Sequence, residues 1–589
     1  MPSSELPPKS PADDTTPQAD PASPTPREGR RRFLTGVAAL GLSGGLAAAS
    51  ENADAATGKA GAHQAPWSSA AVTQHLRARV KTVVVLYSEN RSFNNLFAEF
   101  PGLEKPLTTA EPVTYRQLDR DGRTLLPHLP TVPGGWVTDD QYADGLPYPK
   151  GQQYQQNLAN APFPLTGPRG EAMPLSIITH DLWHVFYQNQ MQINGGKNNM
   201  FAAWADSGGF TMGYYANTSY SLQLWGLAKE FVLCDNFFQG AFGGSFLNHQ
   251  YLIAAAAPRY PDAGNSIAKS MIATTVSGRA DDANLKPLPT SPASALDGIP
   301  KFGPSALTPV ETLPNGKSMS YGVNTMMPPY LPTPTKIKLD ANGVADMTVP
   351  GNASVIVPQT HEHIGDKLNK KGVSWAWYAG AFQQTLDMHG KNASDGTPAI
   401  PNFQYHHQPF NYFANLGPSM PARKQHLRDG GLGDEVTTNH FLRDAQEGTL
   451  PAVTFYKPQG NLNMHAGYAD VASGDRHLAH IVQLLRHSPQ WKDMVVVITV
   501  DENGGWWDHV APPKGDRWGP GTRVPALVIS PFAKRGFVDH TAYDTGSILR
   551  LITRVFDLET LDGLAERDKG LVANGHPPMG DLTHALQLA

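Results

Sequence analysis

The sequence predicts an α/β fold built on a central, mostly parallel sheet. Residues 494–500 and 82–87 are uninterrupted apolar, β-branched runs, the pattern of strands buried on both faces of a parallel sheet. Shorter apolar runs alternate with segments of helical periodicity along the rest of the chain. The stretches 101–175 and 256–352 are rich in Gly and Pro and show little periodicity, so they predict long loop insertions into that fold.

The remaining elements follow from the same patterns. Further strands are expected at residues 231–234, 373–378, 452–456 and 524–530. Helices are expected at residues 180–200, 222–230, 364–370, 475–485 and 544–556.

The chain has 589 residues, a formal charge of −5 and a single cysteine, Cys234. The similar strand ends near both termini favour one large domain, 78–589, carrying the insertion at 256–352. The near-neutral charge and the lack of a basic stripe exclude nucleic-acid binding. Because one cysteine cannot form an intramolecular disulfide, the fold depends on its core and on any bound metal.

The first 55 residues are expected to be a disordered leader and an export signal. The segment 30–35, Arg-Arg-Arg-Phe-Leu-Thr, has the form of a twin-arginine signal, and Ala53-Asp54-Ala55 follows as a small-residue cleavage site. Residues 56–77 have the composition of a linker. We therefore expect export by the twin-arginine machinery to the periplasm or the medium. No later stretch reaches the ~18 apolar residues of a membrane span, so no stable span is expected.

Both long apolar runs end in oxygen ligands. Glu89-Asn90 follows the first run, and Asp501-Glu502 follows the second. If the two strands are neighbours, these four side chains meet at one edge of the sheet. Carboxylates that close repel one another unless one is protonated, so a hard divalent cation is expected between them.

Ser245 stands after Gly243-Gly244 and before an apolar segment, which places it at the start of a helix. There its hydroxyl is exposed, and free backbone N–H groups face whatever it attacks, which suits an anionic phosphoryl group. On local sequence alone, an ordinary capping serine is the alternative.

Four blocks of sequence carry a resemblance to a known family. They are Glu89-Asn-Arg-Ser-Phe93, Gln239-Gly-Ala-Phe-Gly-Gly-Ser-Phe-Leu-Asn-His249, Asp501-Glu-Asn-Gly-Gly-Trp-Trp-Asp-His509 and Gly521-Thr-Arg-Val-Pro-Ala-Leu-Val-Ile-Ser-Pro531. The chain resembles the bacterial phosphoesterase family of secreted acid phosphatases and phospholipases C, whose fold is similar to that of alkaline phosphatase. The acid phosphatase branch is favoured, because phospholipases C of the family usually continue into small C-terminal β domains.

The resemblance also implies roles for individual residues. Its metal ligands match Glu89, Asn90, Ser245, Asp501 and Glu502; its catalytic groups match the nucleophile Ser245 with His407 and His465; and further substrate contacts are expected from His406, His184 and Asn248. Asn94 stands where the family commonly has Asp, and Asp544-Thr545 where an Asp-His pair is common. The oxygen-rich ligand set is compatible with Ca²⁺, Mg²⁺ or Mn²⁺, whereas Zn²⁺ usually prefers a His or Cys ligand.

Three functions remain open on this basis. The first is an exported, metal-dependent acid phosphatase that hydrolyses phosphate monoesters through a phosphoserine. The second is a phospholipase C that acts on phosphatidylcholine-type phosphodiesters, and the third is a non-catalytic phosphate- or metal-binding protein. Because histidines are charged below about pH 6.5, an acidic optimum is expected for the enzyme.

Overall fold

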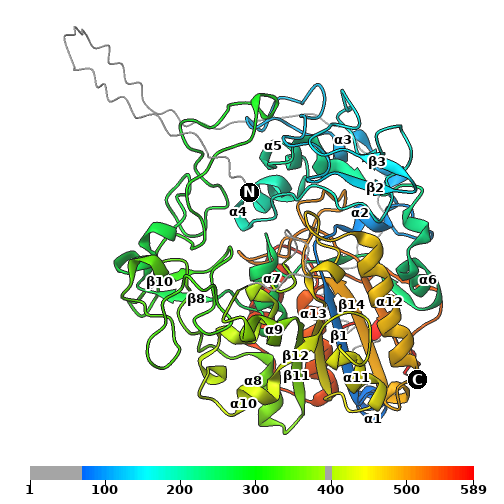
Figure 1. The fold of residues 1–589 in the computed structure, drawn as a ribbon, viewed down its shortest axis with the longest axis vertical. Helices are drawn as coiled ribbons and strands as arrows, with labels where there is room; N and C mark the ends of the chain where they lie inside the picture. Colours follow the sequence, from blue (N-terminus) through cyan, green and yellow to red (C-terminus); the bar gives the residue numbers. More distant parts are fainter. Residues whose placement is uncertain (1–68, 392–400, 589) are drawn as a thin grey trace, which may run out of the picture. The chain divides into compact units, whose positions relative to one another are not determined.

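A computed structural model describes residues 69–391 and 401–588, which belong to the compact unit Gln64–Ala589. The expected twin-arginine motif at 30–35, the cleavage site at 53–55 and most of the expected linker lie outside the described residues. The central feature of the unit is an eight-stranded sheet (Figure 1).

Strands β1 (Thr82–Ser88) and β14 (Met494–Val500) form the middle of this sheet. They pair in parallel from Thr82 against Met494 to Ser88 against Val500, and every residue of both strands is buried. Burial on both faces explains why apolar and polar residues do not alternate along either strand. The expectation that these two runs form buried strands at the centre of one sheet is confirmed.

The other strands extend the sheet on either side. Its order is β12 (Leu427–Gly431), β11 (Trp375–Gly380), β13 (Val453–Lys457), β1, β14, β15 (Ala526–Ile529), β6 (Val232–Cys234) and β16 (Phe537–Asp539). Only β15 runs against its two neighbours, so the predicted mostly parallel sheet is confirmed.

Two groups of helices pack on the sheet (Figure 1). One group contains α1 (Ala70–Arg79), α7 (Ser245–Ala254), α8 (Ile364–Lys370) and α13 (Thr545–Phe556). The other contains α6 (Gln223–Glu230), α11 (His440–Glu447) and α12 (Val471–His487). This α/β arrangement agrees with the predicted fold class. No helix in the described ranges combines the length and apolar character needed to cross a membrane.

One expected helix is much shorter than its sequence pattern. Helix α4 is confined to Phe186–Ile193, whereas residues 180–200 were expected to be helical. Backbone N–H groups just before it bond to side chains instead: Leu182 N–H donates to Asp181 Oδ1 and Trp183 N–H to Asp206 Oδ1. Such local side-chain acceptors compete with the helix, and the left-handed Asn194 ends it.

The segment 256–352 contains more regular structure than its weak periodicity predicts. Its strands β8 (Arg259–Pro261), β9 (Glu311–Thr312) and β10 (Ser318–Tyr321) form a small antiparallel sheet. These strands are too short for an alternation of apolar and polar residues to be recognised in the sequence.

Short elements complete the fold. The helices are α2 (Phe93–Phe97), α3 (Pro112–Tyr115), α5 (Phe201–Trp204), α9 (Phe382–Asp387), α10 (Ala422–His426) and α14 (Asp562–Ala573). The strands are β2 (Gln141–Ala143), β3 (Leu146–Tyr148), β4 (Phe163–Pro164), β5 (Gly213–Tyr214), β7 (Phe237–Phe238) and β17 (Tyr543–Asp544).

Candidate active site

The carboxyl ends of β1 and β14 bring four polar side chains together. Because Ser88 pairs with Val500, Glu89-Asn90 and Asp501-Glu502 leave the sheet side by side. The backbone N–H of Asn90 donates to Asp501 Oδ1 at 3.2 Å. Asn90 has a positive φ of 57°, which asparagine tolerates better than most residues and which turns the chain sharply after the strand. All four side chains are fully buried, so the expected convergence is present.

Ser245 is the first residue of α7 and joins this group. Its Oγ lies 3.4 Å from Asn90 Oδ1 and 3.3 Å from Glu502 Oε1. The preceding loop packs so closely on α4 that a Cβ at Gly243 would lie 2.3 Å from the backbone nitrogen of Phe186, and the φ of Gly243 is +85°. Glycine at 243 is therefore required to bring the serine against the carboxylates.

A half-open cavity of about 310 Å³ lies beside Ser245. Besides Ser245 itself, three expected site residues line it, namely His184, His406 and His465. The cavity is also lined by Phe246, Val323, Asn324, Thr325 and Gln404. Its volume is at the lower end of the ~300–1,000 Å³ typical of ligand pockets, so it admits a phosphoryl group with a small substituent.

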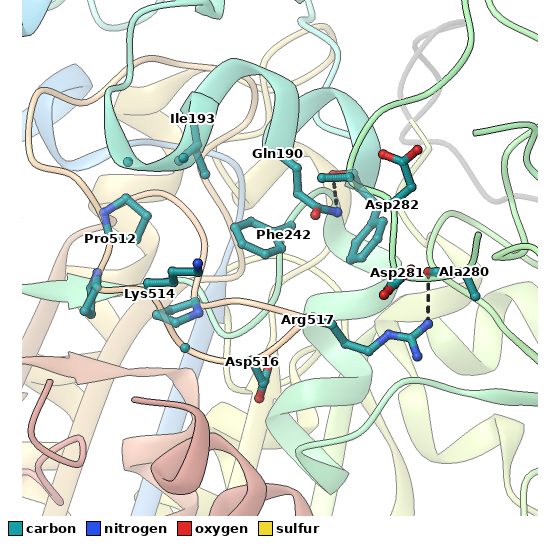
Figure 2. Close-up of a pocket in the computed structure, with 17 residues that line it drawn as sticks. Gln190, Ile193, Phe242, Ala280, Asp281, Asp282, Pro512, Lys514, Asp516 and Arg517 are labelled. Carbon is teal, nitrogen blue, oxygen red and sulfur yellow. Dashed lines mark hydrogen bonds between the residues drawn. The ribbon is translucent and has the colours of Figure 1, made fainter. Parts of the chain in front are cut away.

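A second cavity, of about 280 Å³, is lined by Phe186 and Phe242 but by none of the expected site residues (Figure 2). Lys514 and Asp282 also line it. Although it borders the loop that leads to Ser245, no group in its lining belongs to the carboxylate cluster. The chemistry of the site therefore belongs to the 310 Å³ cavity.

His184 connects the cavity to the carboxylates. Its Nδ1 lies 2.5 Å from the carbonyl oxygen of Leu182, and its Nε2 lies 3.2 Å from Asn90 Nδ2 and 3.8 Å from Glu502 Oε1. Burial alone would lower the pKa of His184, but Glu502 and Asp181 outweigh it and raise this pKa to about 9. His184 is thus the histidine of the cavity that carries a positive charge near neutral pH.

His465 is held by its own loop. Its Nδ1 contacts the carbonyl oxygen of Ala466, and its ring stacks on that of Tyr468 with centroids 4.3 Å apart. The Tyr468 hydroxyl in turn donates to Glu89 Oε2 at 2.8 Å. Burial lowers the pKa of His465, which favours the neutral form of this ring.

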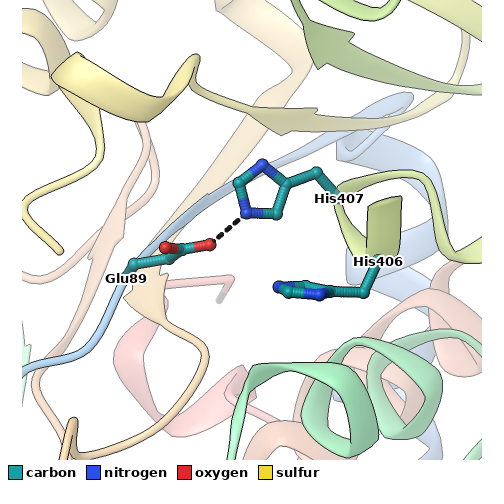
Figure 3. Close-up of side chains that lie close together, drawn as sticks. All are labelled: Glu89, His406 and His407. Carbon is teal, nitrogen blue, oxygen red and sulfur yellow. Dashed lines mark ion pairs between the residues drawn. The ribbon is translucent and has the colours of Figure 1, made fainter. Parts of the chain in front are cut away.

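His407 lies behind Glu89 and does not line the cavity. Both His406 and His407 extend from η10 (Tyr405–His407) toward Glu89 (Figure 3). His407 Nε2 is 2.5 Å from Glu89 Oε1, and its Nδ1 accepts from the backbone N–H of Gln404 at 3.3 Å. With both ring nitrogens occupied, His407 orients Glu89, and His406 is the neighbour that faces the substrate space.

The pKa shifts of three histidines run against the expected acidic optimum. Burial lowers the pKa of His407 to about 4 and that of His406 well below its ordinary range. The pKa of His465 is lowered as well, and all three shifts act against the charge that the expectation needs.

Asn248 also differs from its expected role. Its Oδ1 accepts from the backbone N–H of Ala241, and its Nδ2 donates to the carbonyl oxygens of Ala241, Gly243 and Gly244. The side chain is fully buried and does not line the cavity. Asn248 therefore braces the loop before Ser245, because its amide is already satisfied by the backbone.

Sequence reasoning missed a buried cation, Lys457. Its Nζ lies 2.7 Å from Glu89 Oε1, and its side chain has no exposed surface. Burial alone would raise the pKa of Glu89, but Lys457 and His407 outweigh it and hold that pKa well below the ordinary range. Its place in the sequence could have indicated this role. Lys457 is the last residue of β13, and β13 pairs with β1 on the side opposite to β14.

The cluster carries excess negative charge, which favours a bound cation. The carboxylates of Glu89, Asp501 and Glu502 outnumber the two cations, Lys457 and the protonated His184, by one negative charge. Asp501 Oδ2 is buried without any hydrogen-bond donor, and a carboxylate oxygen of Glu89 lies within 4.8 Å of one of Asp501. Burial, together with the neighbouring carboxylates, raises the pKa of Asp501 to about 6 and that of Glu502 well above its usual range, although Lys457 and His184 act in the other direction.

Comparisons with known proteins bear on this site. The model of the Phosphoesterase family matches residues 80–559. Non-specific phospholipase C6 of Arabidopsis thaliana is 31% identical over 160 residues, which cover 22% of this chain and 30% of that protein. Non-hemolytic phospholipase C of Burkholderia pseudomallei is 27% identical over 253 residues, covering 38% of this chain and 35% of that protein. The matches thus span about a third of the length of these relatives.

Among solved structures, a protein of the alkaline phosphatase superfamily from Vibrio parahaemolyticus matches with a TM-score of 0.25 and 10% identity. That match covers 66% of this chain and 67% of that protein. A likeness of this size supports no argument about the fold, which the sheet itself establishes. The family match, in contrast, includes β1, α7, β14 and every expected site residue. The chain belongs to the Phosphoesterase family.

Proposed function

We propose that the protein is a phosphoric ester hydrolase that cleaves phosphodiesters in the manner of a phospholipase C, with Ser245 as nucleophile. The observation that carries the proposal is the position of Ser245 Oγ, at the first turn of α7, within 3.4 Å of Asn90 and Glu502 and in the lining of the cavity. Relatives named phospholipase C support a diester over the monoester expected from the sequence.

Asn90, Ser245, Asp501 and Glu502, with Glu89, would hold a divalent ion, which when bound lowers the pKa of the serine hydroxyl and offsets charge on the phosphoryl oxygens. Ca²⁺, Mg²⁺ and Mn²⁺ suit these oxygen donors. Ser245 Oγ attacks phosphorus, the Oγ–P bond forms and the bond to the leaving oxygen breaks. Glu502 Oε1, 3.3 Å from Oγ, is within reach of the serine proton.

Two histidines of the cavity have different roles in the reaction. His184 carries its proton at neutral pH, because its pKa is raised to about 9, and it stabilises negative charge that develops on the phosphoryl group. His465 is neutral, so it accepts a proton from the water that hydrolyses the phosphoserine. This division needs no histidine to gain charge at acidic pH.

The first experiment compares kcat/KM for p-nitrophenyl phosphate and p-nitrophenylphosphorylcholine on one preparation. The two substrates share a leaving group and differ in the second substituent. A preference for the diester supports the proposal. A large preference for the monoester would make the protein a phosphatase, as the sequence first indicated.

Ser245→Ala separates catalysis from binding. We expect turnover to fall by at least about 10³-fold, while metal content measured by atomic emission stays equal to that of the parent. Absence of turnover in the parent protein, with phosphate still bound, would support the non-catalytic alternative.

We also infer that the chain is exported by the twin-arginine pathway to the periplasm or the medium. The support is the sequence at 30–35 and the small-residue site at 53–55. Replacing Arg30 and Arg31 by lysine should leave the protein in the cytoplasmic fraction. Unchanged export of that variant would contradict the inference.

A further inference from the structure

Lys457 is fixed against the carboxylate cluster by three contacts. Its Nζ lies 2.7 Å from Glu89 Oε1 and donates to the carbonyl oxygen of Ser88 at 3.2 Å. The same ammonium lies 5.6 Å from the centroid of the Tyr87 ring. Because the side chain has no exposed surface, the ammonium is held by these protein groups and does not exchange them for bulk water.

A set of atoms that can bind a metal includes the same carboxylate. Oxygens of Glu89 and Asp501 and a ring nitrogen of His249 lie within 4.8 Å of one another, and all three side chains are fully buried. His249 belongs to α7, four residues after Ser245, and the sequence gave it no role in metal binding. Two carboxylates and an imidazole are ligands that both Mn²⁺ and Zn²⁺ accept.

His249 and Asp501 each contribute an unpaired atom to this set. His249 Nδ1 donates to the carbonyl oxygen of Ser245 at 2.7 Å, which leaves the lone pair on Nε2. In the described part of the chain, neither this Nε2 nor Asp501 Oδ2 has a hydrogen-bond partner, although both atoms are buried. Asp501 Oδ2 lies 3.7 Å from His249 Nδ1, too far for a hydrogen bond. Since buried polar atoms are nearly always paired, these two atoms indicate a position suited to a cation.

Charge decides between an ammonium and a second metal ion at this position. With Lys457 and the protonated His184 counted, the cluster has an excess of one negative charge, which a single divalent ion already converts into an excess of one positive charge. A further divalent ion would add two more positive charges to a buried site, where repulsion is only weakly screened. Without the ammonium, the buried carboxylate of Glu89 would lose its closest cation and attract another one.

We propose that Lys457 takes the place of a second metal ion and thereby keeps the carboxylate cluster to a single ion. The inference rests on the divalent ion of the proposed function. The ammonium supplies one positive charge beside Glu89 and needs no ligand from His249 or Asp501. Its removal frees the Glu89 oxygen, so that an ion can bind between Glu89, His249 and Asp501.

Lys457→Met tests this, because it removes the charge and keeps an unbranched side chain. After dialysis against Mn²⁺, atomic emission should find one more ion per chain in the variant than in the parent. The two ions would share the Asp501 carboxylate, so the electron paramagnetic resonance spectrum of the variant should show a spin-coupled Mn²⁺ pair that the parent lacks. The matched control is Lys367→Met, since Lys367 is also buried but pairs with Glu362 and Glu559; its metal content should equal that of the parent.

A second variant, Lys457→Gln, serves if methionine beside the buried Glu89 prevents folding, because the amide can still donate to the Ser88 carbonyl. Equal metal content in the folded variant and the parent, two ions in the parent, or the same gain in Lys367→Met would overturn the inference. A gain of one ion without any diester turnover in the parent would retain the inference and remove the proposed reaction. Diester turnover by the parent without a gained ion in the variant would do the reverse.

Discussion

Replacing Asp501 by asparagine tests whether the carboxylate cluster is organised around a cation. Asparagine keeps an oxygen that can accept from the backbone N–H groups of Asn90 and Glu502, as Asp501 Oδ1 does now. It places an amide where Oδ2 is buried without a donor. The change removes one negative charge and little else. The variant should therefore be more stable than the parent without metal and less stable than the parent with metal.

The magnitude follows from the pKa of Asp501, which burial raises from 3.8 to about 6. This difference of about two pKa units corresponds to ~3 kcal/mol. Below about pH 4 both folded and unfolded states hold the proton, so the carboxylate costs nothing. Between about pH 4 and 6 the unfolded state ionises first, and stability falls as pH rises. Above pH 6 the full penalty of ~3 kcal/mol is present, so metal-free Asp501→Asn should be more stable than the parent by up to that amount.

The assay is thermal unfolding of both proteins in a chelator and again with excess Mg²⁺, Ca²⁺, Mn²⁺ or Zn²⁺. For a unit of this size, ~3 kcal/mol corresponds to a rise of about 3 °C in Tm. A metal at 1,000 times its Kd stabilises the parent by about 4.1 kcal/mol. The variant binds it weakly, so the order should reverse. A variant less stable than the parent in chelator at pH 8 would refute the argument that these buried charges lack a partner.

Three further substitutions test the surroundings of the nucleophile. Asn248→Ala leaves buried backbone groups of the preceding loop without a partner, so we expect a loss of ~1–3 kcal/mol in unfolding free energy and a lower kcat with metal content retained; an effect on KM alone would restore Asn248 as a substrate contact. Gly243→Ala must displace the backbone of Phe186, so at least a tenfold loss of kcat is expected, and a fully active variant would contradict the packing. Arg567→Met leaves the buried Asp544 and the partly buried Asp516 without their cation and should cost ~3–5 kcal/mol by denaturant unfolding, with metal affinity unchanged.

The parts predictable from sequence were those fixed by backbone pattern. Continuous apolar runs identified β1 and β14 almost to the residue, and the rule that parallel strands share a carboxyl edge brought Glu89 and Asp501 together. Ser245 was correctly predicted at the start of a helix, because glycine and small polar residues are common where helices begin. These inferences need only local composition and the geometry of a sheet.

What the sequence could not predict is side-chain direction, because local composition does not fix it. His406 and His407 are adjacent, and the short turn of η10 decides which ring faces the cavity and which faces Glu89. Asn248 has the polarity of a ligand-binding residue, but the nearest unpaired groups are backbone atoms. Lys457 was overlooked because a lysine after a strand is usually exposed, whereas this one is buried beside Glu89.

Because β1 lies between β13 and β14, which come much later in the chain, the site can form only after both of these strands have been synthesised. Asn90 and Asp501 are 411 positions apart, a distance that a ribosome covers in about 20 to 80 s at ~5–20 residues per second. Until β13 has been made, the nascent chain exposes an apolar strand that lacks both of its neighbours, and it still lacks β14 afterwards, which makes it a target for chaperones and for aggregation. A chain stopped before Met494 would carry Ser245 and every histidine of the cavity, yet have no carboxylates of β14 to assemble them around.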